Sequence, residues 1–120
     1  MKKKILFFTG SRADYGILKP LIKLIIKKNY ADVKIAAAGQ HFSKTFGNTY
    51  KQILKDKIKI NYKSKISLKK TSLSHIFKYL SESLLDYYKI LNKTKPDLVV
   101  ILGDRYEVFC FAVACYLLNI

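Results

Sequence analysis

The sequence predicts an α/β fold, a Rossmann-like parallel sheet with helices on both faces. Short apolar runs alternate along the chain with longer segments of helical periodicity. Strands that are apolar on both sides are typical of a parallel sheet covered by helices. The 120 residues, 50% of them hydrophobic, can bury a core within one domain. Their apolar runs are shorter than the roughly 18–20 residues that a membrane-spanning helix needs, so no membrane partner is predicted.

The first part of the chain predicts two strands with a helix between them. The apolar run Ile5–Thr9 ends at Gly10, as expected for a buried strand. Apolar residues then recur at helical spacing over Asp14–Lys28, with lysines on the opposite side, and Asn29 ends this helix. A second strand is predicted at Val33–Ala38.

The rest of the chain continues the alternation. It predicts, in order, a short helix, a strand, a long helix, a strand and a helix that is apolar nearly all round: Thr49–Lys55, Ile58–Tyr62, Ser72–Leu91, Leu98–Leu102 and Tyr106–Leu118. The last helix is expected to be buried in a complete domain, and part of its apolar surface is expected to be exposed where the next strand and its helix are missing. Right-handed crossovers should join the parallel strands. Because a further strand would be expected after this helix, residues 1–120 are predicted to be an incomplete Rossmann-like domain portion.

The net charge of +15 raises the question of nucleic-acid binding. It comes from 21 lysines and only two arginines, and the lysines are spread over the whole chain. No recognition motif accompanies them, which favours a solvated lysine-rich surface and predicts no nucleic-acid partner. A nucleic-acid-associated basic protein remains an alternative, which the salt dependence of DNA binding would test.

Cysteine usage and the amino terminus predict a cytoplasmic protein. Cys110 and Cys115 are five residues apart, so in a helix they lie on different sides, which argues against a mutual disulfide. They fit small core residues of a reducing compartment. The basic start precedes an apolar stretch too short for a signal peptide. No His/Cys cluster has zinc spacing, so no metal site is predicted.

The segment TGSRADYG should place a helix N-terminus at the carboxyl edge of the sheet, where such folds bind ligands. Gly10 permits a tight turn, and Ser11 with Asp14 has the spacing of a capping box. The free N–H groups of the helix, together with Arg12, could bind a phosphate. A purely capping role remains open. The segment lacks both the dinucleotide fingerprint and the P-loop lysine.

The segment LGDRYEVF repeats this pattern after the fourth predicted strand. Asp104 either caps the next helix with Glu107, or acts as a catalytic carboxylate beside Arg105. His41, in the loop after the second strand, is a further site candidate, although a lone loop histidine more often packs. If the first and fourth strands are neighbours, Arg12 and Asp104 should face the same cleft.

Three segments, GSRADYGILKPL, GQHFSKTFGNTY and LGDRYEVFCFAVACYLLNI, together resemble the N-terminal part of hydrolysing UDP-N-acetylglucosamine 2-epimerases of sialic and legionaminic acid biosynthesis. The non-hydrolysing relatives have Pro-Glu where this chain has Ala13-Asp14, which favours the hydrolysing branch. The resemblance implies a GT-B-type enzyme with two Rossmann-like domains facing across a cleft. It also implies elimination of UDP across C1–C2 of the sugar, addition of water, and no metal or redox cofactor.

The resemblance also implies roles for particular residues. Asp104 matches the catalytic acid of the family, and Arg12 matches an arginine near the UDP diphosphate. The predicted substrate-binding residues are Gly10, Ser11, Arg12, His41, Arg105 and Glu107. The family's G-G-E and R-H elements and its C-terminal domain have no counterpart in these residues, so the 120-residue segment alone is expected to be inactive.

Two alternatives remain open beside the leading interpretation, and one further expectation concerns assembly. The enzyme could act on a UDP-2,4-diacetamido sugar in place of UDP-N-acetylglucosamine. A stand-alone flavodoxin-like module that binds phosphate or a nucleotide is the second alternative. The complete enzyme is expected to be a homo-oligomer.

Overall fold

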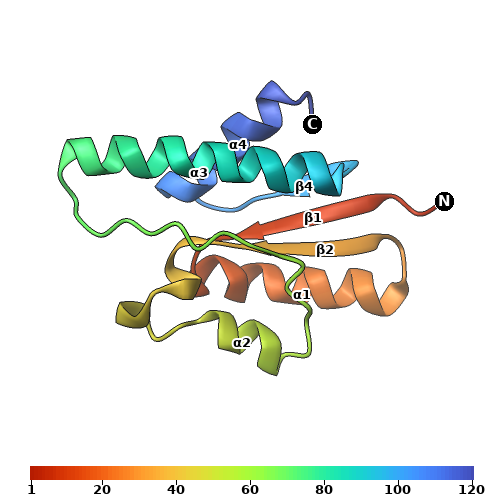
Figure 1. The fold of residues 1–120 in the computed structure, drawn as a ribbon. Coiled ribbons are helices and arrows are strands. Elements are labelled where there is room, and N and C mark those ends of the chain that lie inside the picture. Colours follow the sequence, from red (N-terminus) through yellow and green to blue (C-terminus); the bar gives the residue numbers. More distant parts are fainter.

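The computed structural model describes residues 1–120 and has three layers, with a parallel sheet between two layers of helices (Figure 1). The four strands are β1 (Lys4–Thr9), β2 (Asp32–Ala37), β3 (Tyr62–Lys63) and β4 (Leu98–Val100). The helices α1 (Arg12–Lys28) and α2 (Tyr50–Lys55) lie on one side of the sheet, and α3 (Leu73–Thr94) and α4 (Tyr106–Leu117) lie on the other. The predicted fold class is therefore confirmed.

The strand order is β3-β2-β1-β4, and every pair is parallel. β1 pairs with β2 from Lys4 opposite Asp32 to Thr9 opposite Ala37. On its other side β1 pairs with β4, which confirms that the first and fourth strands are neighbours. Because all strands run the same way, the loops that follow β1, β2 and β4 leave the sheet at one edge.

The side chains of β1 contribute to two separate hydrophobic cores, one on each face of the sheet, because successive side chains of a strand point to opposite faces. Leu6 and Phe8 belong to the cluster under α3 and α4, where Phe8 stacks on Phe111 with ring centroids 4.2 Å apart. Phe7 belongs to the cluster under α1 and α2, together with Tyr15. This double burial explains why β1 is continuously apolar.

The end signals of α1 predicted from the sequence are present. Ser11 is the N-cap and forms a complete capping box with Asp14, and Asn29 is the C-cap in the left-handed conformation at φ 56°. Asparagine tolerates this conformation better than most residues, which explains why the helix ends there.

The third predicted strand, Ile58–Tyr62, is largely wrong in its bounds. Only Tyr62 and Lys63 pair with β2, opposite Ala36 and Ala37. The alternation at Ile58 and Ile60 instead reflects side chains that are buried in the core beside α1 and α2. Period-two burial therefore occurs here without backbone pairing.

The last helix is buried on one side only, as expected for residues 1–120 without the next strand and its helix. Phe111 and Ala114 of α4 are buried, whereas Phe109 and Tyr116 are 65% and 82% exposed. One apolar side of α4 packs on α3 and the sheet, and the opposite apolar side is open. Cys110 and Cys115 are buried and unpaired, as predicted for core residues.

None of the helices is both long enough and apolar enough to cross a lipid bilayer.

Candidate functional site

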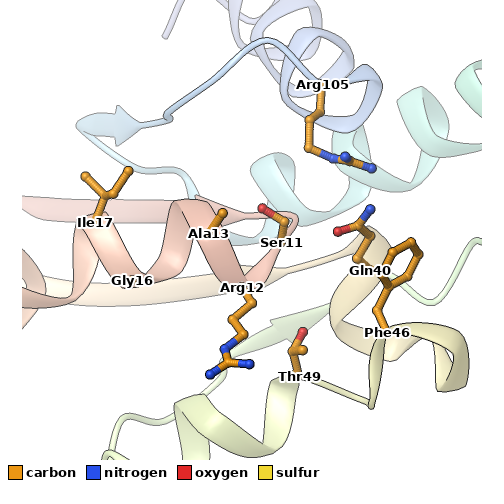
Figure 2. A pocket seen from close by; sticks show the side chains of 9 residues that line it. All are labelled: Ser11, Arg12, Ala13, Gly16, Ile17, Gln40, Phe46, Thr49 and Arg105. Carbon is orange, nitrogen blue, oxygen red and sulfur yellow. The ribbon is translucent and has the colours of Figure 1, made fainter.

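An open cavity of about 710 Å³ lies at the carboxyl edge of the sheet (Figure 2). Its lining comes from the first turns of α1, the loop after β2 and the start of α4, and includes Ser11, Arg12, Gln40, Thr49 and Arg105. A second cavity of about 310 Å³ adjoins it, since Gln40, Phe46 and Arg105 line both. The turns after β1 and β4 therefore contribute to one continuous site, as the strand order requires.

The turn after β1 is organised by the buried carboxylate of Asp14. Its Oδ2 accepts from the N–H groups of Gly10 at 3.2 Å and Ser11 at 3.0 Å, and from Ser11 Oγ at 2.9 Å. Its Oδ1 accepts from the Thr9 hydroxyl. Asp14 is only 7% exposed, so it fixes the turn and does not face the cavity. Arg12, one residue past the N-cap, extends toward Thr49 in Figure 2.

His41 connects this turn to the loop after β2. It is fully buried, with Nε2 2.8 Å from Thr9 Oγ1 and Nδ1 2.9 Å from Thr49 Oγ1. Because Thr9 gives its proton to Asp14, it accepts from Nε2–H, which leaves Nδ1 to accept from Thr49. Burial lowers the pKa of His41, and the neighbouring negative charges of Asp14 and Glu107 oppose that shift. The imidazole is therefore neutral at pH 7 and lies behind the cavity wall.

The turn after β4 contradicts the capping interpretation of Asp104, and its catalytic role stays a prediction. Asp104 does not cap α4, because the N-cap residue is Arg105 and no side chain bonds the helix start. Arg105 pairs with Glu107, not with Asp104: its Nε donates to Glu107 Oε1 at 2.9 Å. Asp104 is exposed, follows Gly103 at φ 99°, and lines neither cavity.

The electrostatics of the cavity favour an anion. Arg12 and Arg105 both line it; Arg105 is ion-paired with the buried Glu107, whereas Arg12 forms no ion pair. The N-terminal turn of α1 adds unpaired N–H groups and the positive end of the helix dipole. Guanidinium groups bind phosphate oxygens in a bidentate manner, so a phosphorylated ligand fits this surface best.

The structure separates the sequence-predicted residues into three groups. Ser11, Arg12 and Arg105 line the main cavity, and Glu107 lines the adjoining one. Gly10 and His41 lie beneath the surface, and Asp104 stays exposed beside Arg105 in the chain. Their roles remain predictions.

Sequence reasoning missed two cavity residues, Gln40 and Thr49. Gln40 contacts the Arg105 guanidinium: with its amide oxygen turned toward Arg105 it accepts from Nη2 at 2.8 Å and Nη1 at 3.2 Å. The hydrogen bond between Thr49 Oγ1 and His41 Nδ1 holds the Thr49 side chain in place. Both stand in the loop segment GQHFSKTFGNTY, whose polar composition was the available signal.

The fold and site define a class: Rossmann-like α/β proteins with an open, arginine-lined cavity at the carboxyl edge of a parallel sheet. A comparison with protein families is more specific. Residues 23–120 match the family model described as UDP-N-acetylglucosamine 2-epimerase. The chain belongs to the UDP-N-acetylglucosamine 2-epimerase family.

Curated relatives agree with this assignment. The chain is 36% identical over 118 residues to the polysialic acid biosynthesis protein P7 of Escherichia coli, which covers 98% of this chain and 30% of that protein. It is 32% identical over 120 residues to the UDP-N,N'-diacetylbacillosamine 2-epimerase (hydrolyzing) of Legionella pneumophila, covering 100% of this chain and 32% of the relative. The chain thus spans about a third of the length of the curated relatives that it matches.

Solved structures confirm the fold. The crystal structure of UDP-GlcNAc 2-epimerase from Neisseria meningitidis bound to UDP-GlcNAc superposes with a TM-score of 0.79 at 22% identity, over 97% of this chain and 30% of that one. A second UDP-N-acetylglucosamine 2-epimerase structure gives a TM-score of 0.84 at 20% identity, over 100% and 32% of the two chains. The predicted Rossmann-like sheet of a GT-B-type protein is therefore confirmed.

Proposed function

We propose that these residues form the N-terminal Rossmann-like domain portion of a hydrolysing UDP-N-acetylglucosamine 2-epimerase, which converts UDP-N-acetylglucosamine to N-acetylmannosamine and UDP. The observation that carries this proposal is the pair of arginines, Arg12 and Arg105, lining one cavity at the carboxyl edge of a chain that belongs to this family. A UDP-sugar presents a diphosphate, which is the kind of anion that such a surface binds.

In the proposed reaction, Arg12 and the N-terminus of α1 hold the diphosphate. A base removes the proton on C2 while the C1–oxygen bond breaks and its electron pair leaves with UDP. Water then adds across the resulting double bond. Hydroxide bonds to C1, and a proton bonds to C2 on the face opposite the one from which the first proton was removed. Asp104 is the candidate acid–base residue because it matches the acid of the family's G-D-R element; it lies exposed beside Arg105, outside both cavity linings, and caps no helix. No metal or redox cofactor is needed to balance these steps.

A UDP-2,4-diacetamido sugar is the alternative substrate. Its support is the relative from Legionella pneumophila, whose name gives diacetylbacillosamine as the sugar and which matches this chain over its whole length. A stand-alone phosphate- or nucleotide-binding module is the alternative of another class, and the cavity beside α1 is the feature that favours it.

The experiment is an assay of the complete gene product that contains this sequence. It is incubated separately with UDP-N-acetylglucosamine and with the UDP-2,4-diacetamido sugar, and products are followed by NMR. Release of UDP together with the free 2-epimer supports the proposal, and the faster substrate identifies the sugar. A product that stays linked to UDP would indicate a non-hydrolysing epimerase. Binding without turnover would favour the binding module.

Two further parts of the proposal concern the protein as a whole. We expect the enzyme to be cytoplasmic and a homo-oligomer, which fractionation and sedimentation would test. We also expect the 120-residue segment alone to release no sugar from UDP-N-acetylglucosamine, because Arg12, Arg105 and one helix terminus supply a single cavity wall. Turnover by the segment would contradict the need for a second wall.

A further inference from the structure

Glu107 is a buried carboxylate that the proposed reaction does not use. It is 2% exposed, although it belongs to the first turn of α4 beside two exposed residues, Arg105 and Tyr106. Its side chain turns back toward the sheet edge, where burial and, to a lesser extent, the Glu107 carboxylate raise the pKa of the Tyr79 hydroxyl. Burying a charge is unfavourable unless it is paired, so its position requires an explanation.

Glu107 fits against two glycines of other loops. A Cβ atom on Gly10 would lie 2.6 Å from Glu107 Cγ, and one on Gly39 would lie 2.8 Å from Glu107 Oε1. Real Cβ atoms do not approach other heavy atoms this closely. The absence of side chains at both positions therefore creates the space that the Glu107 side chain occupies, between the loops that follow β1 and β2.

The carboxylate in that space holds Arg105. Glu107 Oε1 accepts from Arg105 Nε at 2.9 Å, and the Gln40 amide oxygen, when turned toward Arg105, accepts from both terminal nitrogens. The guanidinium is thus held by Glu107 from its own segment and by Gln40 from the loop after β2, while it lines both cavities with its side chain 43% exposed. Figure 2 shows Arg105 extending from the start of α4 toward Gln40.

We propose that Glu107 is a positioning residue: it fixes the Arg105 guanidinium between the two cavities so that the remaining N–H donors face an anionic group of the UDP-sugar. This inference rests on the proposed function for the identity of the ligand. It assigns Glu107 no contact with the substrate and makes Arg105 the group through which it acts. The same arrangement explains why positions 10 and 39 are glycines, since a Cβ atom at either position would overlap the Glu107 side chain.

A double-mutant cycle tests the proposal in the complete gene product. Glu107→Gln keeps the shape of the side chain but removes the ionic partner of Arg105. We expect it to raise KM for the UDP-sugar about tenfold, the scale of one hydrogen bond to a charged group. We expect no further rise when Glu107→Gln is added to Arg105→Gln, because the residue acts through Arg105. Rises in KM that multiply independently would overturn the proposal.

The same four proteins give a readout that does not depend on activity. Arg105→Gln leaves a buried carboxylate without its cation and should lower the unfolding temperature by several degrees. Adding Glu107→Gln should restore part of that loss. If the second substitution instead lowers the unfolding temperature further, Glu107 only fills space against the glycines and the inference fails. The unfolding temperatures can be compared even if the wild type shows no epimerase activity. Absence of epimerase activity would count against the proposed function alone.

Glu82→Gln is the matched control. Glu82 pairs with Lys78 at 3.9 Å on the exposed surface of α3, so the same chemical change occurs there without burial. We expect KM within twofold of wild type and an unchanged unfolding temperature, since exposed pairs contribute little. A change in KM equal to that of Glu107→Gln would show that loss of any nearby negative charge is sufficient, and would overturn the specific role of Glu107.

Discussion

The turns after β1 and β4 have similar sequences, yet the structure uses their acidic residues in different ways. After β1, Ser11 and Asp14 hydrogen-bond to each other, so Asp14 stabilises the turn to which it belongs. After β4, Asp104 caps nothing, while Glu107 reaches Arg105 and the glycines of two other loops. The comparison teaches that a capping-box spacing does not decide whether an acid acts within its turn or between turns. Long-range packing decides it.

The largest expected effect concerns the exposed acid of the second turn. Asp104→Asn in the complete gene product should lower turnover about 10²-fold or more, the scale of a positioned acid–base group. Its stability should not change, because Asp104 is exposed and makes no capping bond. UDP release and thermal unfolding measure the two quantities. Turnover within a few-fold of wild type would remove Asp104 from the reaction and leave the second turn with only a binding role.

The acid of the first turn should matter chiefly for stability. Asp14→Ala removes the capping box and the acceptor of the Gly10 N–H group and the Thr9 hydroxyl, so we expect a loss of about 2–4 kcal/mol in the free energy of unfolding. Asp104→Ala should stay within about 0.5 kcal/mol of wild type. Urea unfolding of both variants gives the comparison directly. Equal losses would mean that the two turns do not differ as described.

The glycines before the two turns should also differ. Gly10→Ala brings a Cβ into Glu107 and should cost about 1–3 kcal/mol. That cost should shrink when Glu107 is also changed to Ala. Gly103 has open space but φ 99°, so Gly103→Ala should cost about 1–2 kcal/mol whatever stands at position 107. Urea unfolding of the single and double variants checks this. If Gly10→Ala lowers the free energy of unfolding equally with and without the Glu107 side chain, the packing argument is contradicted.

The smallest expected effect is a pH dependence from His41, which connects the first turn to the loop after β2. Burial lowers the pKa of His41, whereas in the unfolded chain it protonates near ~6.5. Its contribution to stability is therefore complete above about pH 6.5 and is lost as the pH falls through the lower pKa of the folded state. The free energy of unfolding should drop less between pH 7.5 and 5.5 in His41→Gln than in wild type.

The other histidine supplies the control for this measurement. His75 is exposed near the start of α3, so His75→Gln should keep the pH dependence of wild type. Equal behaviour of the two variants would show that His41 does not account for the pH dependence.

Much of the fold could be predicted because it depends on local patterns. Apolar periodicity gave the helices and the buried strands, and Asn29 marked the end of α1. β3 was misplaced because Ile58 and Ile60 are buried without pairing, and burial alone sets the pattern that sequence reasoning detects. An exposed apolar surface on α4 was expected, but the sequence could not assign it to the side of Phe109 and Tyr116, because an all-apolar helix does not indicate which side is covered.

The candidate site could be predicted only as far as the loops that form it. The positions after β1 and β4 followed from topology, and Arg12 and Arg105 line the same cavity. Arg105 and Glu107 are only two positions apart, but the space that Gly10 and Gly39 leave for Glu107 joins residues up to about a hundred positions apart. No spacing rule within one segment can reveal such contacts.

The central place of β1 has a consequence for how the chain folds. β1 pairs with β2 across a single helix, but its other edge pairs with β4 more than ninety residues later. Local pairings form before distant ones, because closing a long loop costs more entropy. We therefore expect β1, α1 and β2 to assemble first, with one edge of β1 left unpaired until β4 arrives. During synthesis that apolar edge is the segment most exposed to aggregation and to chaperone binding.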